Sequence, residues 1–241
     1  LKYLILAFSV LLMSCDKNNA EVLENPSKYL LTTVEYDQIS GVDPNLLSLD
    51  IYYDKVTENK KPVVIWVHGG AWCIGDKSIQ MEEKLSLFES LYYILVSVNY
   101  RLSPIPYQVN NPDRIQFPTH NNDVANSIKW VYDHIEQYGG NPNKIAILGH
   151  SAGAHLVSLI GTNPSFLENV GLNFSNIKGV AAIDTEGYNV LKQVQENNSM
   201  LINAFGIDSI TNIQASPLLN IKNGISYPKF FLLKFNLSYN L

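Results

Sequence analysis

Cysteine and positive charge are both scarce in this 241-residue sequence. It has two cysteines, Cys15 and Cys73, and 22 acidic against 17 basic residues give a net charge of −5. If Cys15 lies outside the folded part, no intramolecular disulfide can form, and stability has to come from a hydrophobic core. The acidic balance provides no broad positive surface, so we expect no nucleic-acid partner.

Histidine is also unevenly distributed. None occurs in the last third of the chain, and the five that exist are His68, His120, His134, His150 and His155. Histidine is the usual general base beside a catalytic serine, so this distribution limits any mechanism that needs one.

The length and the 46% hydrophobic content suit one α/β domain. Residues 30–36 and 46–53 read as an antiparallel hairpin. From residue 62 onward, strand patterns alternate with helical ones, which predicts a mostly parallel sheet with helices on both faces. Ligands of such sheets bind at the carboxyl ends of the strands.

Individual elements follow from hydrophobic spacing. Residues 63–67 are a continuous apolar run, as expected of a buried strand, and residues 229–235 form a last apolar strand. A helix is predicted over residues 78–92, and Asn122 is predicted to cap another. The apolar stripe of the first helix would consist of Met81, Leu85, Phe88 and Tyr92.

The N-terminus resembles an export signal. Residues 1–14 contain a short apolar run that stops at Cys15, in a pattern similar to the bacterial lipobox. We therefore expect a lipoprotein signal at 1–14, a lipidated Cys15, a tether at 15–29 and a domain at 30–241. This predicts an exported, membrane-anchored lipoprotein, located in the bacterial periplasm or at the outer membrane. An ordinary signal peptide or a buried helix is the alternative.

The sequence Gly149-His150-Ser151-Ala152-Gly153 lies between a predicted strand and a predicted helix. A strand that turns sharply into a helix exposes the turn residue, and small neighbours leave room for it. Ser151 is therefore the predicted nucleophile. A helix N-cap serine is the plainer interpretation, but it does not explain a glycine on either side.

A second motif, His68-Gly69-Gly70-Ala71-Trp72, follows the predicted strand at 63–67. Acyl transfer needs backbone N–H groups directed at the developing oxyanion, and glycine allows close approach. We assign the oxyanion hole to Gly69, Gly70 and Ala71, with the N–H of Ala152 as a further donor. His68 is expected to shape this loop rather than to act as the base.

These motifs resemble the α/β-hydrolase fold, and in particular esterases with an HGG motif of the bacterial feruloyl-esterase-like (BD-FAE) group. The resemblance covers residues 30–232. It rests on the two motifs above together with Gly75-Asp76-Lys77, Asn99-Tyr100-Arg101, Phe117-Pro118, Asp123 and Ala215-Ser216-Pro217. It implies that Arg101 and Asp123 are structural partners.

The resemblance also implies a Gly-x-Asp segment with the acid after the strand at 229–235, then a further strand, a loop that carries the histidine, and a last helix. Neither residue is present in the pattern expected there. Asp184 is the one tentative acid, from an alternative position. We expect a domain incomplete at its C-terminus, through truncation or a frameshift, and little activity from the chain as written, because loss of the base costs about 10⁶-fold in turnover.

The resulting hypothesis is a serine hydrolase of small carboxylic esters, with carbohydrate-linked esters as one option, that uses no cofactor and no metal. The segment around 103–118 and the region 186–225, with Tyr188, Leu191 and Phe205, would form the walls of the acyl pocket. An arylformamidase-like or peptidase-like hydrolase is one alternative. A non-catalytic lipoprotein that binds glycans or another ligand is the other.

Overall fold

The computed structural model describes residues 28–54, 60–105 and 114–234. The predicted signal, Cys15 and most of the tether lie outside these residues. The strands are β1 (Leu30–Glu35), β2 (Ser48–Tyr53), β3 (Lys61–Val67), β4 (Ile94–Val98), β5 (Gly140–His150), β6 (Ile177–Ile183) and β7 (Lys229–Leu233). The helices are α2 (Glu82–Ser90), α3 (Thr119–His134), α4 (Ala152–Thr162), α5 (Ser165–Glu168), α6 (Val190–Gln195), α7 (Ser199–Phe205) and α8 (Ser209–Gln214).

The strands form one sheet in the order β1-β2-β4-β3-β5-β6-β7. β1 pairs with β2 and β2 with β4 in antiparallel fashion, and every later pairing is parallel. The predicted hairpin and the mostly parallel sheet are therefore confirmed. Parallel pairing places the ends of β3 and β5 at the same edge, where Val67 is the register partner of Gly149.

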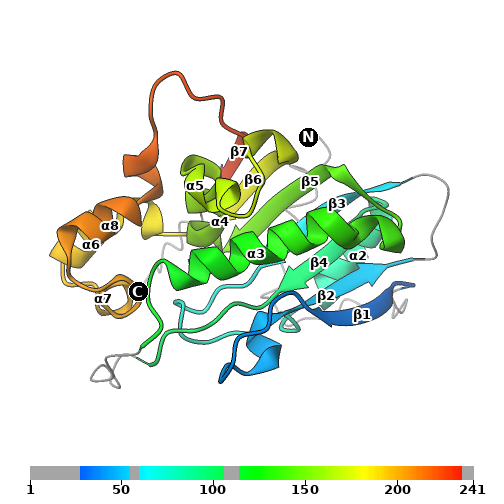
Figure 1. The fold of residues 1–241 in the computed structure, drawn as a ribbon, viewed down its shortest axis with the longest axis horizontal. Helices are drawn as coiled ribbons and strands as arrows, with labels where there is room; N and C mark the ends of the chain where they lie inside the picture. Colours follow the sequence, from blue (N-terminus) through cyan, green and yellow to red (C-terminus); the bar gives the residue numbers. More distant parts are fainter. Residues whose placement is uncertain (1–27, 55–59, 106–113, 235–241) are drawn as a thin grey trace, which may run out of the picture.

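Two apolar layers cover the sheet, one on each face. Alternate strand residues such as Ile65, Val96 and Ile147 pack on the face that carries α3 and α4. Trp66 and Leu148 point to the opposite face, where Phe88 of α2 packs on them. Figure 1 shows α3 lying across the strands, with α6, α7 and α8 grouped beyond one end of the sheet. Within the described ranges, no helix is long and apolar enough to cross a membrane.

Several predicted boundaries were wrong. The helix expected over 78–92 is α2, which ends at Ser90, and Tyr92 adopts a φ of 59° and is 73% exposed instead of joining the apolar stripe. The helix expected to be capped by Asn122, and so to begin at Asp123, begins four residues earlier, at Thr119. Periodicity locates the centre of a helix better than its ends, because the terminal turns depend on local backbone contacts.

Candidate active site

Ser151 occupies a strained turn between β5 and α4. It is half-buried, and its backbone has φ 53° and ψ −116°, a conformation that costs a non-glycine residue energy and is usually retained at functional sites. The Ser151 N–H donates to Ile183 O at 2.9 Å, which ties the turn to β6. The side chain therefore sits at the carboxyl edge of the sheet, at the N-terminus of α4, where the helix dipole favours negative charge.

The flanking glycines are required by close backbone contacts. A Cβ on Gly149 would lie 2.3 Å from the carbonyl oxygen of Gly153, and a Cβ on Gly153 would lie 2.1 Å from Val67 O. No side chain fits in either place. The glycines thus let α4 begin directly against the end of β3.

The segment that follows β3, residues 68–75, is called the oxyanion loop here. A Cβ built on Gly69 would lie 2.9 Å from His150 O and 3.2 Å from Ser151 Cβ, so this loop abuts the nucleophile turn. Gly70 has φ 117° and Ala71 φ 50°. Among the residues that the structure describes, the amides of Gly70, Ala71 and Ala152 have no hydrogen-bond partner. The arrangement can stabilise an oxyanion formed at Ser151.

Trp72 anchors the oxyanion loop in the core. Its side chain is 4% exposed although its φ is 60°, and it packs edge-to-face on His155 at 5.3 Å and on Phe205 at 4.9 Å between ring centroids. The N–H of Ser103 donates to Trp72 O at 2.8 Å. Phe205 is consequently a core residue, 2% exposed, and its predicted place in the acyl-pocket wall was wrong.

Four of the five histidines are bonded away from the nucleophile. His68 Nδ1 pairs with Gly69 O at 2.7 Å, His120 Nε2 with Ser103 Oγ at 3.0 Å, His134 Nδ1 with Trp130 O at 2.8 Å and His155 Nε2 with Ala215 O at 2.8 Å. His150 is exposed beside Ser151. Across 28–54, 60–105 and 114–234, no imidazole hydrogen-bonds to Ser151 Oγ.

His68 has the structural role expected of it. Its ring stacks on Tyr100 at a centroid distance of 4.5 Å, and Tyr100 donates its hydroxyl to His68 O at 3.1 Å. Burial lowers the pKa of His68, so the ring is neutral at pH 7. A neutral, stacked ring fixes the entry to the oxyanion loop.

His120 and His155 are completely buried neutral rings. Burial lowers the pKa of His120 to about 3 and that of His155 to about 4. His120 joins α3 to the segment after β4, and His155 joins α4 to Ala215 and Trp72. Both act as packing residues behind the site.

Asp184 follows β6 directly and adopts a φ of 52°. Its N–H donates to Leu233 O at 2.7 Å, and its carboxylate interacts electrostatically with His150 and Tyr188. The structure thus brings Asp184 and Tyr188 to the same edge of the sheet as Ser151. A role for Asp184 as the acid stays a prediction.

Arg101 and Asp123 form the predicted structural pair. Asp123 Oδ2 accepts from Arg101 Nε at 2.8 Å and from its backbone N–H at 2.9 Å, while Oδ1 accepts from Nη2 at 2.6 Å. The Asp123 side chain is completely buried. Its hydrogen bonds raise the pKa of Arg101, and the pair fixes the segment after β4 to α3.

Cys73 lies within the oxyanion loop and is only partly buried. Burial of the thiol raises its pKa, so it is not an activated thiolate. In the described ranges, no group of three or more His, Cys, Asp or Glu side chains could hold a metal ion.

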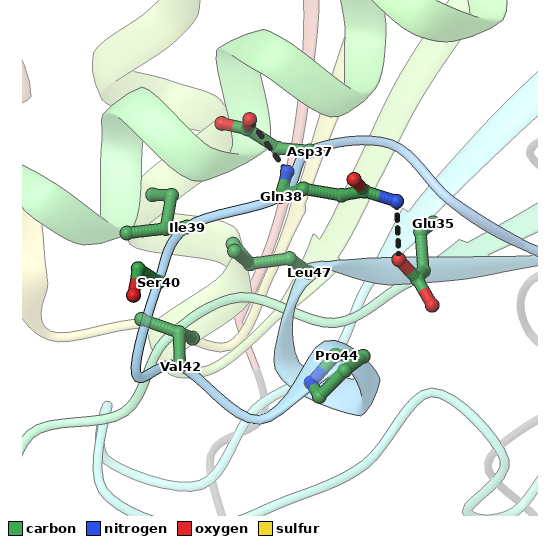
Figure 2. A pocket seen from close by; sticks show the side chains of 8 residues that line it. All are labelled: Glu35, Asp37, Gln38, Ile39, Ser40, Val42, Pro44 and Leu47. Carbon is green, nitrogen blue, oxygen red and sulfur yellow. Dashed lines mark hydrogen bonds between the residues drawn. The ribbon is translucent and has the colours of Figure 1, made fainter.

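The hairpin loop between β1 and β2 also lies at this edge, because β1 runs in the same direction as β4. A hollow of about 330 Å³ lies in it, drawn in Figure 2. It is lined by Glu35, Asp37, Gln38, Ile39, Ser40, Val42, Pro44 and Leu47. None of these residues belongs to the oxyanion loop or the nucleophile turn.

Comparisons with known proteins agree with this geometry. A family model described as BD-FAE matches residues 49–225. Esterase LipQ of Mycobacterium tuberculosis is 38% identical over 132 residues, covering 55% of this chain and 29% of that protein. The probable carboxylic ester hydrolase LipM of the same organism is 41% identical over 104 residues, covering 43% and 22%. The chain thus spans less than a third of either relative.

The crystal structure of esterase B from Lactobacillus rhamnosis superposes with a TM-score of 0.68 at 23% identity. The match covers 86% of this chain and 65% of that one. At this identity the likeness establishes the fold alone, and the predicted α/β-hydrolase fold is confirmed.

Proposed function

Because the chain belongs to the BD-FAE family, we propose that its site hydrolyses carboxylic esters through an acyl-enzyme on Ser151. The observation that carries the proposal is the strained Ser151 turn, held against an oxyanion loop whose Gly70 and Ala71 amides have no partner among the described residues. In the first step Ser151 Oγ attacks the ester carbonyl, its proton passes to a base, and the alcohol leaves. Water then releases the acid and restores the serine.

The amides of Gly70, Ala71 and Ala152 would stabilise the negative charge on the carbonyl oxygen in both steps. Removing one such donor costs other serine hydrolases about 10²–10³ in turnover. Among the described residues, no imidazole hydrogen-bonds to Ser151 Oγ to serve as the general base. We therefore expect a slow reaction from these residues alone, with a residual about 10³–10⁴ over water from the oxyanion hole and binding.

Added imidazole tests whether Ser151 and the oxyanion amides are functional and only a general base is needed. The rate of p-nitrophenyl acetate hydrolysis would be measured with and without imidazole, in the wild type and in Ser151→Ala, which serves as the control for catalysis by imidazole in solution. We expect imidazole to increase the wild-type rate beyond that of the variant, since it supplies the missing proton acceptor. Equal rates in both proteins at every imidazole concentration would refute the proposal.

The substrate class is proposed more narrowly as small esters, including acyl groups linked to carbohydrate. The two sequence alternatives, a formamide or peptide hydrolase and a glycan-binding lipoprotein, are separated by the same assay. Turnover of anilide or formamide substrates in preference to esters would favour the first, and glycan binding without any Ser151-dependent turnover would favour the second.

We further propose that Cys15 carries a lipid that anchors the exported protein to a bacterial membrane. The support is the apolar run that stops at this cysteine. Metabolic labelling with a clickable fatty acid should mark the wild type and not Cys15→Ser, and labelling of both proteins alike would contradict the anchor.

A further inference from the structure

The oxyanion loop has an unusual backbone that requires external support. Gly70, Ala71, Trp72 and Gly75 all have positive φ values, of 117°, 50°, 60° and 118°. In the non-glycine residues Ala71 and Trp72, such conformations persist only where the surroundings over-determine them. β3 and the His68–Tyr100 stack hold the start of the loop, and its end needs a restraint of its own.

Asp76 lies immediately after the loop and collects hydrogen bonds from three segments. Its Oδ2 accepts from Asn45 Nδ2 at 3.0 Å and from Asn99 Nδ2 at 2.8 Å. Its Oδ1 accepts from the Ser78 N–H at 2.9 Å and from Ser78 Oγ at 2.6 Å. Partial burial opposes ionisation, but the bonds from Ser78, Asn99 and Asn45 hold the pKa of Asp76 well below its usual range.

Lys77 is buried next to this carboxylate and bonds to the same two asparagines. Its N–H donates to Asn99 Oδ1 at 2.6 Å, and its Nζ donates to Asn45 Oδ1 at 2.8 Å. Nζ also lies 3.6 Å from Asp50 Oδ1, and the carbonyl of Lys77 accepts from Ser97 Oγ at 2.7 Å. With 6% exposure, this ammonium group is paired on the β2 and hairpin side and is not directed at the site.

We propose that Asn45, Asp76, Lys77 and Asn99 form a positioning cluster that fixes the oxyanion loop relative to Ser151. Asn45 comes from the loop before β2, and Asn99 from the end of β4. The cluster therefore attaches the end of the oxyanion loop to two elements on the far side of β3 from Ser151. Gly75 transmits this restraint, since a Cβ there would lie 2.4 Å from His68 Nδ1.

Substitution of Asn45 can distinguish an effect on loop position from an effect on folding. Its side chain is exposed and bonds to Asp76 and Lys77, and it touches neither the nucleophile turn nor the oxyanion amides. Its truncation to alanine removes the side-chain bonds to Asp76 and Lys77 without leaving a cavity in the core, while the Asn45 carbonyl still accepts from Asn99 Nδ2 at 3.0 Å. The cluster's role in the reaction rests on the proposed function, whereas its role in holding the loop does not.

The test compares Asn45→Ala with Gln38→Ala. Gln38 is an exposed amide in the same hairpin loop, bonded only to Glu35 and Asp37 among the described residues (Figure 2). Hydrogen exchange of peptides covering residues 69–77 would be followed by mass spectrometry. We expect about tenfold faster exchange in Asn45→Ala, with Gln38→Ala unchanged, and Asp76→Asn as a second variant that weakens the same cluster.

The second readout is the Ser151-dependent rate in the presence of imidazole. We expect kcat to fall about tenfold in Asn45→Ala with KM unchanged, because the oxyanion amides act in the transition state. Unchanged loop exchange in both cluster variants would overturn the proposal, and so would faster exchange with an unchanged kcat. If the wild type shows no Ser151-dependent rate, the proposed function fails, and the exchange data still decide whether the cluster holds the loop.

Discussion

The nucleophile turn and the oxyanion loop meet at one point but are held in different ways. The turn at Ser151 is fixed by backbone contacts alone: Gly149 abuts Gly153, Gly153 abuts Val67 O, and the Ser151 N–H donates to Ile183 O. The oxyanion loop is fixed by side chains from distant segments, through Trp72 in the core and Asp76 at its end. The turn consists of close backbone contacts and tolerates no added atom, whereas the loop depends on many weaker side-chain contacts that can be removed one at a time.

Gly153→Ala should produce the largest effect, because the new Cβ would meet Val67 O at 2.1 Å and His68 O at 2.6 Å. Val67 is the last residue of β3 and His68 O accepts from the Tyr100 hydroxyl, so both carbonyls are held in place. We therefore expect destabilisation of about 5 kcal/mol, enough to unfold a domain of ordinary stability. The matched control is Gly179→Ala in β6, where the nearest atom to an added Cβ is Lys229 O at 3.5 Å. Urea denaturation measures both, and equal stability of the two variants would contradict the steric argument.

The second largest effect should be a loss of folding stability at acidic pH, caused by the buried rings of His120 and His155. His120 and His155 have folded pKa values of about 3 and about 4, both below the unfolded value of 6.5. The unfolded chain therefore binds more protons, and the stability present above pH 6.5 is lost as the pH falls toward the folded values. The expected loss between pH 7.5 and 5 is about 2 kcal/mol for each histidine.

Denaturation of wild type and His155→Gln at the two pH values isolates the contribution of one ring. The variant should lose about 2 kcal/mol less than the wild type on acidification, because it lacks a buried imidazole that must take up a proton on unfolding. The same pH dependence in both proteins would show that His155 is not held neutral.

Arg101→Lys should have a smaller effect. Lysine keeps the charge beside Asp123 but cannot reproduce the paired Nε and Nη2 bonds, so we expect destabilisation of about 2 kcal/mol. Lys129→Arg, in the exposed pair with Asp133 on α3, is the matched control and should change stability by less than about 0.5 kcal/mol. If both variants melt at the wild-type temperature, the pair does not fix the segment after β4.

The sequence predicted the features whose signals are neighbours in the chain. These are the Ser151 turn, the strand before the oxyanion loop and, through the hydrophobic runs, the parallel strands. The roles of Asp76 and Asn99 could not be predicted, although both residues belong to the motifs that carry the family resemblance.

Asn45 gave no signal for its place in the cluster, since its partners there, Asp76, Lys77 and Asn99, are 31 or more residues away and only the folded sheet brings them together. Phe205 was misplaced for a related reason. The sequence assigned Phe205 to the region that was expected to cover the sheet edge. Its ring points into the core because it packs on Trp72 and His155, which the sequence does not reveal.

The most direct test of the central claim is to map the site of reaction with a fluorophosphonate. The protein would be incubated with the probe in the presence of imidazole, digested with protease and analysed by mass spectrometry. We expect one phosphonylated peptide, modified at Ser151 and absent from Ser151→Ala. Modification elsewhere, or none under conditions that label an active serine esterase, would contradict the claim that Ser151 is the nucleophile.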